Sequence, residues 1–391
     1  MTEPRRAFVV VMDAVGAGAL PDAPAYGDPA DADTLGHLAQ AVGGLDLPTL
    51  GRLGLGNIRL LEGVPPVAAP AALHGRLRPL GPGKESVTGH WELMGVVPPV
   101  PLPTFPGGFP PDVVRELEGV SGRRFCCNQP YNGQRAMVDF GQHHARTGEL
   151  ILYTSVDSVL QLAAHVEVLG ERELQDLCRR IREDVMVGPR AVGRVIARPF
   201  AGPPGRYERT EGRRDFSVLP PTRSYLEEIS GRGIPVHAVG KTHDLFAGVG
   251  FTARHPGASN AAALAETTRL IRGELDRGLV FTNLIETDQR YGHRKDVHGF
   301  HRALQGIDEA VAGWLDLLRP GDLLVLTADH GVDPAAPHTD HTREHAPLLA
   351  VFEGHAGRAH DGPLADVGAT CLAWLAGDGA AADGLPGASF G

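Results

Sequence analysis

Aspartate and histidine side chains follow three apolar segments of this sequence, in residues 7–12, 279–285 and 323–327. Each segment has the length and the aliphatic content of a buried β-strand. Open α/β sheets bind ligands at the carboxyl ends of their strands, so these distant side chains can converge. Carboxylates and imidazoles together suit Mn²⁺ or Zn²⁺ better than Ca²⁺, which prefers oxygen alone. We therefore predict a site for two divalent ions with the ligands Asp13, Asp288, His293, Asp329, His330 and His341.

The segment after residue 327 is rich in such groups, since it also contains His338, Asp340 and His345. The simplest alternative is a solvated polar loop, because Asp is a common loop residue. That alternative accounts for any one of these residues, but not for so many of them after one buried strand. We expect His338, Asp340 and His345 to support the metal ligands without binding metal themselves.

A hydroxyl group, that of Ser86, stands at the start of a helix that we predict after the Gly- and Pro-containing residues 81–83. A serine in this position is most often only a helix cap. The start of a helix also presents unpaired N–H groups and the positive end of the helix dipole, which suit a phosphate group. Beside a divalent cation, Ser86 could therefore act as an activated nucleophile.

The composition describes an ordinary soluble chain of two domains, since 391 residues exceed what one hydrophobic core usually fills. The net charge of −10 and the pI near 6.0 argue against a nucleic-acid-binding protein, which normally has a basic face. No apolar run is long enough to span a membrane. The four cysteines form no regular spacing, so we expect a cytoplasmic protein.

Two Pro-rich stretches, at residues 97–109 and 216–223, mark the expected domain boundaries. Strands alternate with helices outside them, which predicts an α/β fold with a mostly parallel sheet core flanked by helices. We assign residues 1–100 and 217–391 to a metal-binding catalytic core domain. We assign residues 101–216 to an inserted, smaller α/β cap domain that binds substrate.

Within the insertion we expect helices near residues 112–118, 161–164 and 172–183, with strands near 150–153 and 191–199. The Gly- and Ala-rich residues 376–391 are expected to form a loose tail. The insertion also carries small polar and basic groups. Arg194 and Arg209 are candidates for a bidentate grip on phosphate, whereas Arg213 and Arg214 are expected to be solvated.

Several long motifs, in this order along the chain, resemble those of the phosphopentomutase family within the alkaline phosphatase superfamily. They are GKESVTGHWELMG at residues 83–95, YTSVDSVLQLAAH at 153–165, GRVIARPF at 193–200, ETDQRYGHR at 286–294, and TADHGVDP with HTDHTREH at 327–345. The resemblance runs from Asp13 to the final predicted strand. Several long motifs in the right order are far more specific than one short pattern.

The resemblance implies an alkaline-phosphatase-like core and an isomerase that interconverts ribose 1-phosphate and ribose 5-phosphate, or their 2-deoxyribose equivalents. It implies two Mn²⁺ ions, a phosphorylated enzyme, a pentose bisphosphate intermediate and a sugar bisphosphate as primer. The family usually has threonine where this chain has Ser86, and Thr88 falls two residues late. No protein partner is implied, and we expect a monomer.

The resemblance also assigns individual residues. One metal would be held by Asp288, His293 and His341, and the other by Asp13, Asp329 and His330 with the oxygen of Ser86. The substrate would be contacted by Ser155, Asp157, Arg194, Arg209 and Lys241.

Three other functions remain open at this point. Cofactor-independent phosphoglycerate mutase shares the core and the metals, but its inserted domain differs from the motifs at residues 153–165 and 193–200. A metal-dependent phosphohydrolase would use the same core and lose the phosphoryl group to water. An inactive carbohydrate-phosphate binding protein would not need all six metal ligands.

Overall fold

The computed structural model describes residues 5–155, 157–377 and 382–391, and the chain forms two compact units. The first unit combines Met1–Val100 with Pro220–Gly391, and the second unit is Pro101–Leu219. The second unit extends a few residues beyond the expected boundary at residue 216, because the strand β8 (Arg214–Ser217) pairs with a strand of that unit.

The sheet of the first unit is organised around β1 (Arg6–Met12), which lies between β11 (Gly278–Leu284) and β12 (Asp322–Thr327). All three strands are parallel and are buried along their whole length. Such strands are covered on both faces, which explains their continuous apolar sequences. The guanidinium of Arg6 is buried too, and it donates to both carboxylate oxygens of Asp322 at 2.8 and 2.5 Å.

Among the described residues, the sheet has the strand order β10-β9-β11-β1-β12-β13-β2-β14. The pairs β12–β13 and β13–β2 are antiparallel and the others are parallel, so the prediction of a mostly parallel sheet is confirmed. The outer strands are β2 (Leu73–Arg78), β9 (Val236–Val239), β10 (Ala253–His255), β13 (Ala346–Val351) and β14 (Gly362–Pro363).

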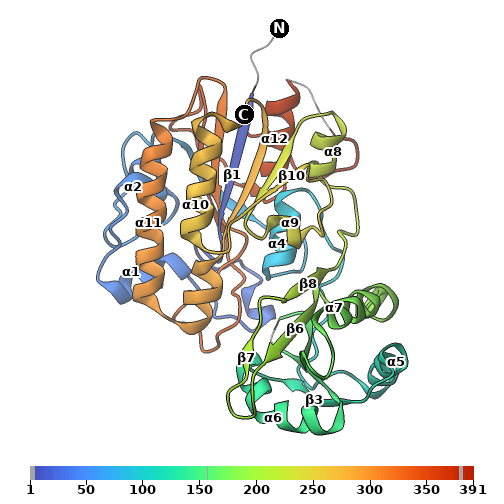
Figure 1. Cartoon of the computed structure of the whole chain (residues 1–391). Helices are drawn as coiled ribbons and strands as arrows, with labels where there is room; N and C mark the ends of the chain where they lie inside the picture. The colour runs from blue at the N-terminus through green and yellow to red at the C-terminus, as the bar shows by residue number, and fades with distance from the viewer. Residues whose placement is uncertain (1–4, 156, 378–381) are drawn as a thin grey trace. The chain divides into compact units, whose positions relative to one another are not determined.

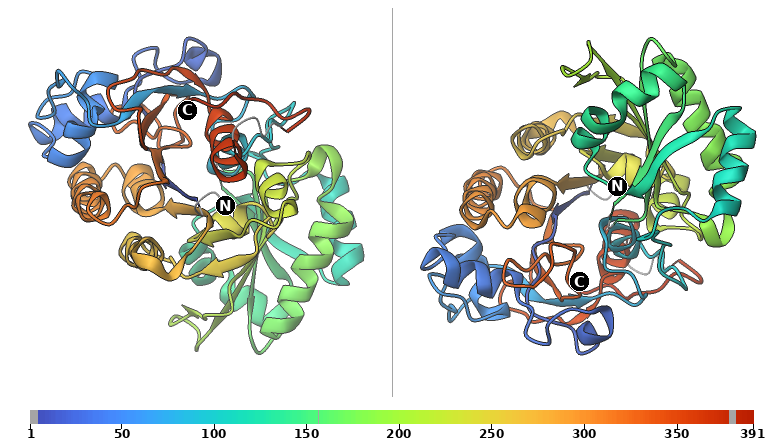
Figure 2. Two further views of the ribbon diagram at one scale, coloured as in Figure 1. Left: turned by 90° about the horizontal axis from the view of Figure 1, so that it is seen from above. Right: turned by 90° about the horizontal axis from the view of Figure 1, so that it is seen from below.

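Helices cover both faces of this sheet, as Figures 1 and 2 show. The helices α10 (Asn260–Arg269) and α11 (Val297–Leu315) lie on one side of β1, and α12 (Asp366–Ala376) lies on the other. The remaining helices of this unit are short: η1 (Ala23–Tyr26), α1 (Thr34–Val42), α2 (Pro48–Leu53), α3 (Leu55–Ile58), α4 (Ser86–Leu93), α8 (Tyr225–Gly231), α9 (Thr242–Leu245), η4 (Leu270–Glu274), η5 (Thr287–Tyr291) and η6 (Gly292–Arg294).

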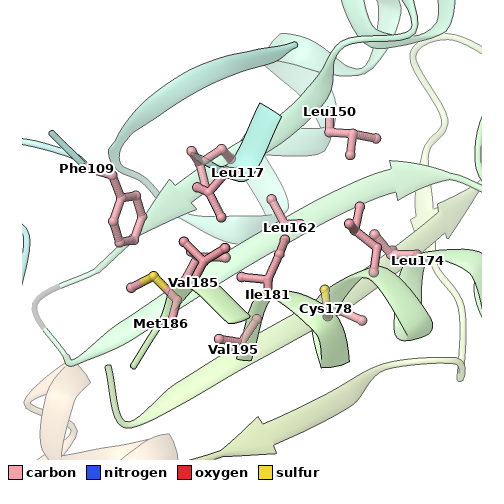
Figure 3. Close-up of a cluster of buried hydrophobic side chains, with 14 of the residues drawn as sticks. Phe109, Leu117, Leu150, Leu162, Leu174, Cys178, Ile181, Val185, Met186 and Val195 are labelled. Carbon is pink, nitrogen blue, oxygen red and sulfur yellow. The ribbon is translucent and has the colours of Figure 1, made fainter. Parts of the chain in front are cut away.

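The second unit has its own sheet, with the strand order β3-β4-β5-β6-β7 and β8 paired to β6. Its helices and strands are β3 (Phe125–Pro130), β4 (Leu150–Thr154), β5 (Val159–His165), β6 (Arg194–Ala201), β7 (Glu208–Arg209), α5 (Pro111–Ser121), α6 (Gly133–Thr147), α7 (Glu171–Arg180), η2 (Ile181–Val185) and η3 (Gly188–Arg190). Figure 3 shows part of its apolar core, where Leu162 of β5 faces Ile181 and Leu117.

The predicted helix at residues 161–164 is wrong. These residues belong to β5, which is buried throughout and pairs with β4 on one side and β6 on the other. A short apolar run does not distinguish a buried strand from a buried helix by periodicity alone. Burial between two strands decided the conformation here, against the helix propensity of its alanines.

The loose tail expected at residues 376–391 is also contradicted where the structure describes it. The N–H of Ala388 donates to Asp366 at 2.7 Å, the N–H of Phe390 donates to Thr370 at 3.1 Å, and Phe390 is buried. Residues 378–381 of that segment lie outside the described residues. Across the part of the chain that the structure describes, no helix is long and apolar enough to cross a membrane.

Candidate active site

The three central strands of the first unit end at the same level. Met12 pairs with Leu284, and Val11 pairs with Thr327, so the chain leaves β1, β11 and β12 at one edge of the sheet. Asp13 directly follows β1, Asp329 comes two residues after β12, and Asp288 lies in η5 just after β11. Strand register therefore brings together carboxylates that are about 300 residues apart in sequence.

The first ligand group consists of Asp13, Asp329 and His330, all at most 4% exposed. The Nε2 atom of His330 lies 3.4 Å from Asp13 Oδ1 and 3.2 Å from Asp329 Oδ2. The hydroxyl of Ser86 joins this group, at 3.0 Å from the same Nε2 atom and 3.4 Å from Asp13 Oδ1. The structure thus places the predicted nucleophile against one set of predicted ligands.

The second ligand group consists of Asp288, His293 and His341. Asp288 Oδ1 lies 3.2 Å from His293 Nε2 and 3.5 Å from His341 Nε2. Asp288 and His341 are buried, whereas the side chain of His293 is 24% exposed. His293 Nδ1 donates to the carbonyl of Thr339 at 2.6 Å, so its Nε2 atom keeps a lone pair for a metal.

The two groups form one continuous site. The rings of His330 and His341 meet edge to face with their centroids 4.3 Å apart. Ligand atoms of Asp288, His330 and His341 all lie within 4.8 Å of one another. Two neighbouring cations could share such a site.

Two carboxylate oxygens show that these residues suit a cation. Asp288 Oδ1 and Asp329 Oδ2 are buried and have no hydrogen-bond partner, although each faces ring nitrogens. Buried polar atoms are normally hydrogen-bonded, so an unpartnered carboxylate oxygen indicates an ion that completes the site. Oxygen and nitrogen ligands of this kind fit a divalent metal such as Mn²⁺ or Zn²⁺.

The electrostatics of the site agree with this assignment. Burial and the neighbouring charges of Asp329 and Asp288 raise the pKa of Asp13. Burial lowers the pKa of His341, but its contacts with Asp288 and Asp340 outweigh burial and raise that pKa to about 10. Protons on His330 and His341, whose pKa values are raised, therefore balance the buried carboxylates in the metal-free protein, and bound cations would take over that role.

The start of α4 distinguishes Ser86 from its competitor Thr88. The helix cap is neither of them but Glu85, whose carboxylate accepts from the N–H groups of Val87 and Thr88 at 3.0 and 2.9 Å. The Thr88 hydroxyl is buried and donates to the carbonyl of Glu85 at 3.1 Å. Glu85 thus occupies two of the helix amides that were expected to face a phosphate group, and the phosphate contact itself stays a prediction.

Two supporting residues, His90 and Asn283, were not assigned from the sequence. His90 Nδ1 lies 3.0 Å from Asp329 Oδ2, and Asn283 donates to Asp13 Oδ2 at 2.7 Å. The two side chains also meet each other at 3.1 Å. A signal was available: His90 lies four residues after Ser86 on one helix face, and Asn283 is a polar residue inside an apolar strand.

Helix α4 also approaches the candidate metal ligands through its backbone. A Cβ atom placed on Gly89 would lie 2.5 Å from the carbonyl oxygen of Asp329. Only glycine allows this approach without movement of one segment. Arg343 fixes the preceding loop, because its guanidinium donates to the carbonyls of Gly81 and Gly83 at 3.0 and 2.7 Å.

The other polar residues after β12 contact different partners. His338 Nε2 lies 3.1 Å from Asp28 Oδ1, and His345 Nδ1 lies 3.3 Å from the carbonyl of Gly18. Asp340 accepts from the backbone N–H of His341 at 2.8 Å. Of the three, Asp340 is therefore the one placed to orient a candidate ligand.

The predicted substrate residues lie in both units. In the first unit, Lys241 Nζ lies 3.5 Å from Gln289 Oε1. In the second unit, Ser155 Oγ lies 3.5 Å from Asp157 Oδ2, and the N–H of Arg194 donates to the neighbouring carbonyl of Ser158 at 3.2 Å. Ser155, Asp157 and the backbone of Arg194 thus lie at one end of the sheet.

The backbone of Arg209 lies near the other end of the same sheet. It pairs with Phe200, six residues beyond Arg194 on β6, which corresponds to about 20 Å of strand. A Cβ atom on Gly133 would lie 2.8 Å from the Arg209 guanidinium and 2.6 Å from the Tyr153 hydroxyl. The structure therefore groups Arg209 with Tyr153 and the start of α6, and its backbone is not beside that of Arg194.

Comparisons with known proteins bear on the whole chain. A model of the Metalloenzyme superfamily matches residues 5–377. A phosphopentomutase of Anaeromyxobacter sp. (strain K) is 49% identical over 369 residues, which cover 94% of each chain. A phosphopentomutase of Symbiobacterium thermophilum is 45% identical over 383 residues, covering 95% of this chain and 94% of the relative.

Among solved structures, one of Leishmania mexicana phosphoglycerate mutase has a TM-score of 0.48 at 13% sequence identity, covering 99% of this chain and 98% of that one. The family match and the identity to the two phosphopentomutases, each over nearly the full length, agree with the strand-end ligands described above. This chain belongs to the Metalloenzyme superfamily and, within it, to the phosphopentomutase family.

Proposed function

We propose that this protein is a phosphopentomutase that interconverts ribose 1-phosphate and ribose 5-phosphate, or the 2-deoxyribose equivalents, through a phosphoserine and a pentose bisphosphate. Its family membership supports the reaction. The observation that carries the mechanism is the Ser86 hydroxyl, which lies 3.0 Å from His330 and 3.4 Å from Asp13 at the edge of a two-part ligand site.

Two Mn²⁺ ions fit the ligand set, with Asp13, Asp329 and His330 holding one and Asp288, His293 and His341 the other. When bound, such ions supply Lewis acidity to phosphoryl oxygens and neutralise their charge. Asn283 and His90 hold the carboxylates of Asp13 and Asp329 in place. Thr339 holds the ring of His293 so that its Nε2 atom faces Asp288.

Ser86 carries the phosphoryl group between turnovers in this mechanism. In the first step the P–Oγ bond of phosphoserine breaks, and a new P–O bond forms to the free hydroxyl of the sugar monophosphate. In the second step Ser86 Oγ attacks the other phosphorus atom of the bisphosphate, and that sugar–phosphate P–O bond breaks. A sugar bisphosphate is the primer, because it supplies the first phosphoryl group.

The contacts of the non-reacting phosphate and of the sugar are also proposed. Ser155, Asp157 and Arg194 are grouped in the second unit, and the planar fork of Arg194 suits bidentate binding of phosphate. Arg209 supplies a second planar fork for phosphate, and Lys241 completes the set as a point charge. The free cysteines among the described residues suit a reducing cytoplasm, and we propose a monomer there that acts on small phosphosugars.

The test is to incubate the protein with a sugar bisphosphate and to map the phosphorylated peptide by mass spectrometry. We expect phosphate on Ser86, none in Ser86→Ala, and retained turnover in Ser86→Thr, which restores the family's usual hydroxyl. Thr88→Val is the matched control, because it removes the neighbouring hydroxyl and should leave Ser86 phosphorylated. Phosphate on Thr88, or normal turnover by Ser86→Ala, would contradict the assignment.

A second assay separates the possible reactions. The protein is supplied with ribose 5-phosphate, 3-phosphoglycerate or a generic phosphomonoester, each with Mn²⁺ and primer. We expect isomerisation of the pentose phosphate alone, with little release of inorganic phosphate. Turnover of 3-phosphoglycerate, or rapid release of phosphate from all three, would replace the proposed function by one of the alternatives.

A further inference from the structure

A second group of metal-binding side chains lies in the second unit, separate in sequence from the six candidate ligands already described. It consists of Cys126, His143 and Glu149, and one ligand atom of each lies within 4.8 Å of the other two. The closest pair is His143 Nε2 and Glu149 Oε2, at 2.8 Å. The three side chains are partly buried. Together they place one sulfur, one nitrogen and one oxygen atom where a single metal ion could bind all three.

The fold of this unit explains the convergence. Cys126 lies on β3, the edge strand, where it pairs with Ile151 of β4, and Glu149 stands just before β4. His143 lies near the end of α6, which stops at Gly148 in a left-handed conformation with φ of 77°. That turn brings Glu149 back beside His143, since the N–H of Gly148 still donates to the carbonyl of His144.

The neighbouring groups leave the Cys126 thiol weakly bonded, whereas His143 and Glu149 contact each other. The thiol of Cys126 makes only a long contact with the carbonyl of Leu150, at 3.6 Å. Burial and the charge of Glu149 raise the pKa of Cys126 to about 12, so this thiol is not a reactive thiolate by itself. A thiol, an imidazole and a carboxylate this close together form an arrangement that a metal ion would stabilise.

We propose that Cys126, His143 and Glu149 bind a thiophilic divalent cation of the Zn²⁺ type, with water as the fourth ligand. Zinc sites take these three ligand types, and Zn–ligand bonds of about 2.0–2.3 Å separate neighbouring ligand atoms by about 3.3–3.7 Å. The ligand atoms lie within 4.8 Å of one another, which is close to those separations. The side chains of His143 and Glu149 are 40% and 27% exposed, which leaves access for the ion and the water.

The chemistry of this site differs from that of the first unit. The six candidate ligands there offer only oxygen and nitrogen, whereas Cys126 offers sulfur, which selects Zn²⁺ over Mn²⁺. The bound ion would join the edge strand β3 to α6 and to the start of β4, and so stabilise the second unit. It takes no part in phosphoryl transfer.

Cobalt provides a specific probe, because a thiolate bonded to Co²⁺ gives an intense charge-transfer absorption that oxygen and nitrogen ligands do not. The full-length protein is first saturated with Mn²⁺ and then titrated with Co²⁺. We expect a thiolate band that saturates at about one Co²⁺ per chain and disappears when Zn²⁺ is added. The band should be absent in Cys126→Ser and at least about tenfold harder to saturate in His143→Gln.

Cys127→Ser is the matched control, because the adjacent thiol interacts with Gln129 instead and should leave the band unchanged. Thermal unfolding of protein already saturated with Mn²⁺ gives a second readout: added Zn²⁺ should raise the Tm of the wild type and of Cys127→Ser more than that of Cys126→Ser, because only the first two keep the thiol. The proposal is overturned if the wild type gives no thiolate band at saturating Co²⁺, or if the band survives in Cys126→Ser. Unchanged pentomutase turnover in Cys126→Ser would confirm that the site is independent of catalysis.

Discussion

The two ligand groups of the first unit differ in how firmly the fold holds them. Asp13, Asp329 and His330 are at most 4% exposed and follow two central strands. In the second group, His293 is 24% exposed and lies in the short helix η6. The better-supported group is the one that also contacts the Ser86 hydroxyl. This difference indicates that the fold holds the candidate ligands beside the Ser86 hydroxyl more firmly than those of the second group.

The contacts that orient the candidate ligands also differ between the two groups. Asp329 meets His90 on one side and accepts from the N–H of Ala14 at 3.2 Å on the other. Ala14 has a φ of 65°, a left-handed conformation that costs a residue with a side chain about 1 kcal/mol or more. In the second group the orienting contacts of His293 and His341 come from Thr339 and Asp340, which belong to one loop.

The largest effect is expected from Asp329→Asn, which removes an anionic oxygen from the more rigid group. We expect loss of one bound metal and a fall in turnover of about a thousandfold or more, because neighbouring ligands cannot replace that charge. Metal content by mass spectrometry and steady-state assays check it. Asp361→Asn, at an exposed site, is the control. A variant with full metal content and normal turnover would remove Asp329 from the site.

A smaller effect is expected from His293→Gln in the more exposed group. The variant should keep one metal ion firmly and bind the second weakly, with turnover reduced about a hundredfold and partly restored at high Mn²⁺. His298→Gln, five residues on at an exposed position, should behave like the wild type. If His293→Gln instead lost both ions together, the two groups would not differ in the way described.

His90→Gln tests whether the supporting contacts matter. Because His90 orients Asp329 and touches no reacting atom, we expect metal affinity to fall about 10–100-fold, as for other residues behind a metal ligand. Turnover at saturating Mn²⁺ should recover to near the wild-type value. A low turnover that no metal concentration restores would mean that His90 acts in the chemical step.

The smallest effect concerns stability and pH in the metal-free protein. The pKa of His341 is raised to about 10 from 6.5, so its proton contributes stability that is fully present below pH 6.5 and is lost as the pH rises through 10. Metal-free protein should therefore unfold more easily at pH 9.5 than at pH 6.5, and Mn²⁺ should reduce this difference. In the metal-free His341→Gln variant the decrease should be smaller. Equal pH dependence in wild type and variant, measured by urea unfolding, would contradict it.

Much of the first unit could be predicted, because its signals are local. Continuous apolar strands ending on Asp or His indicate both a covered parallel sheet and the edge where ligands meet. The central order β11-β1-β12 could not be predicted in this way, because strands that each end on a carboxylate can converge at one edge in more than one order.

The second unit was less predictable for physical reasons. β5 was assigned to a helix because its burial comes from two neighbouring strands and not from its own periodicity. β3 was missed because it is a half-buried edge strand with a bulge between Cys127 and Gln129, so its residues do not alternate. The roles of His90 and Asn283 depend on contacts across the fold that no spacing in the sequence expresses.

The close approach of Gly89 to Asp329 has a consequence for engineering this enzyme. Because backbone meets backbone there, no side chain can be shortened or repacked to adjust the spacing between the serine and the metal ligands. A graft of the serine loop onto a related scaffold would have to carry both segments together. Conversely, a single methyl group at position 89 would force the two segments apart, and so would lengthen the distance between Ser86 and the candidate ligands without removing any of these groups.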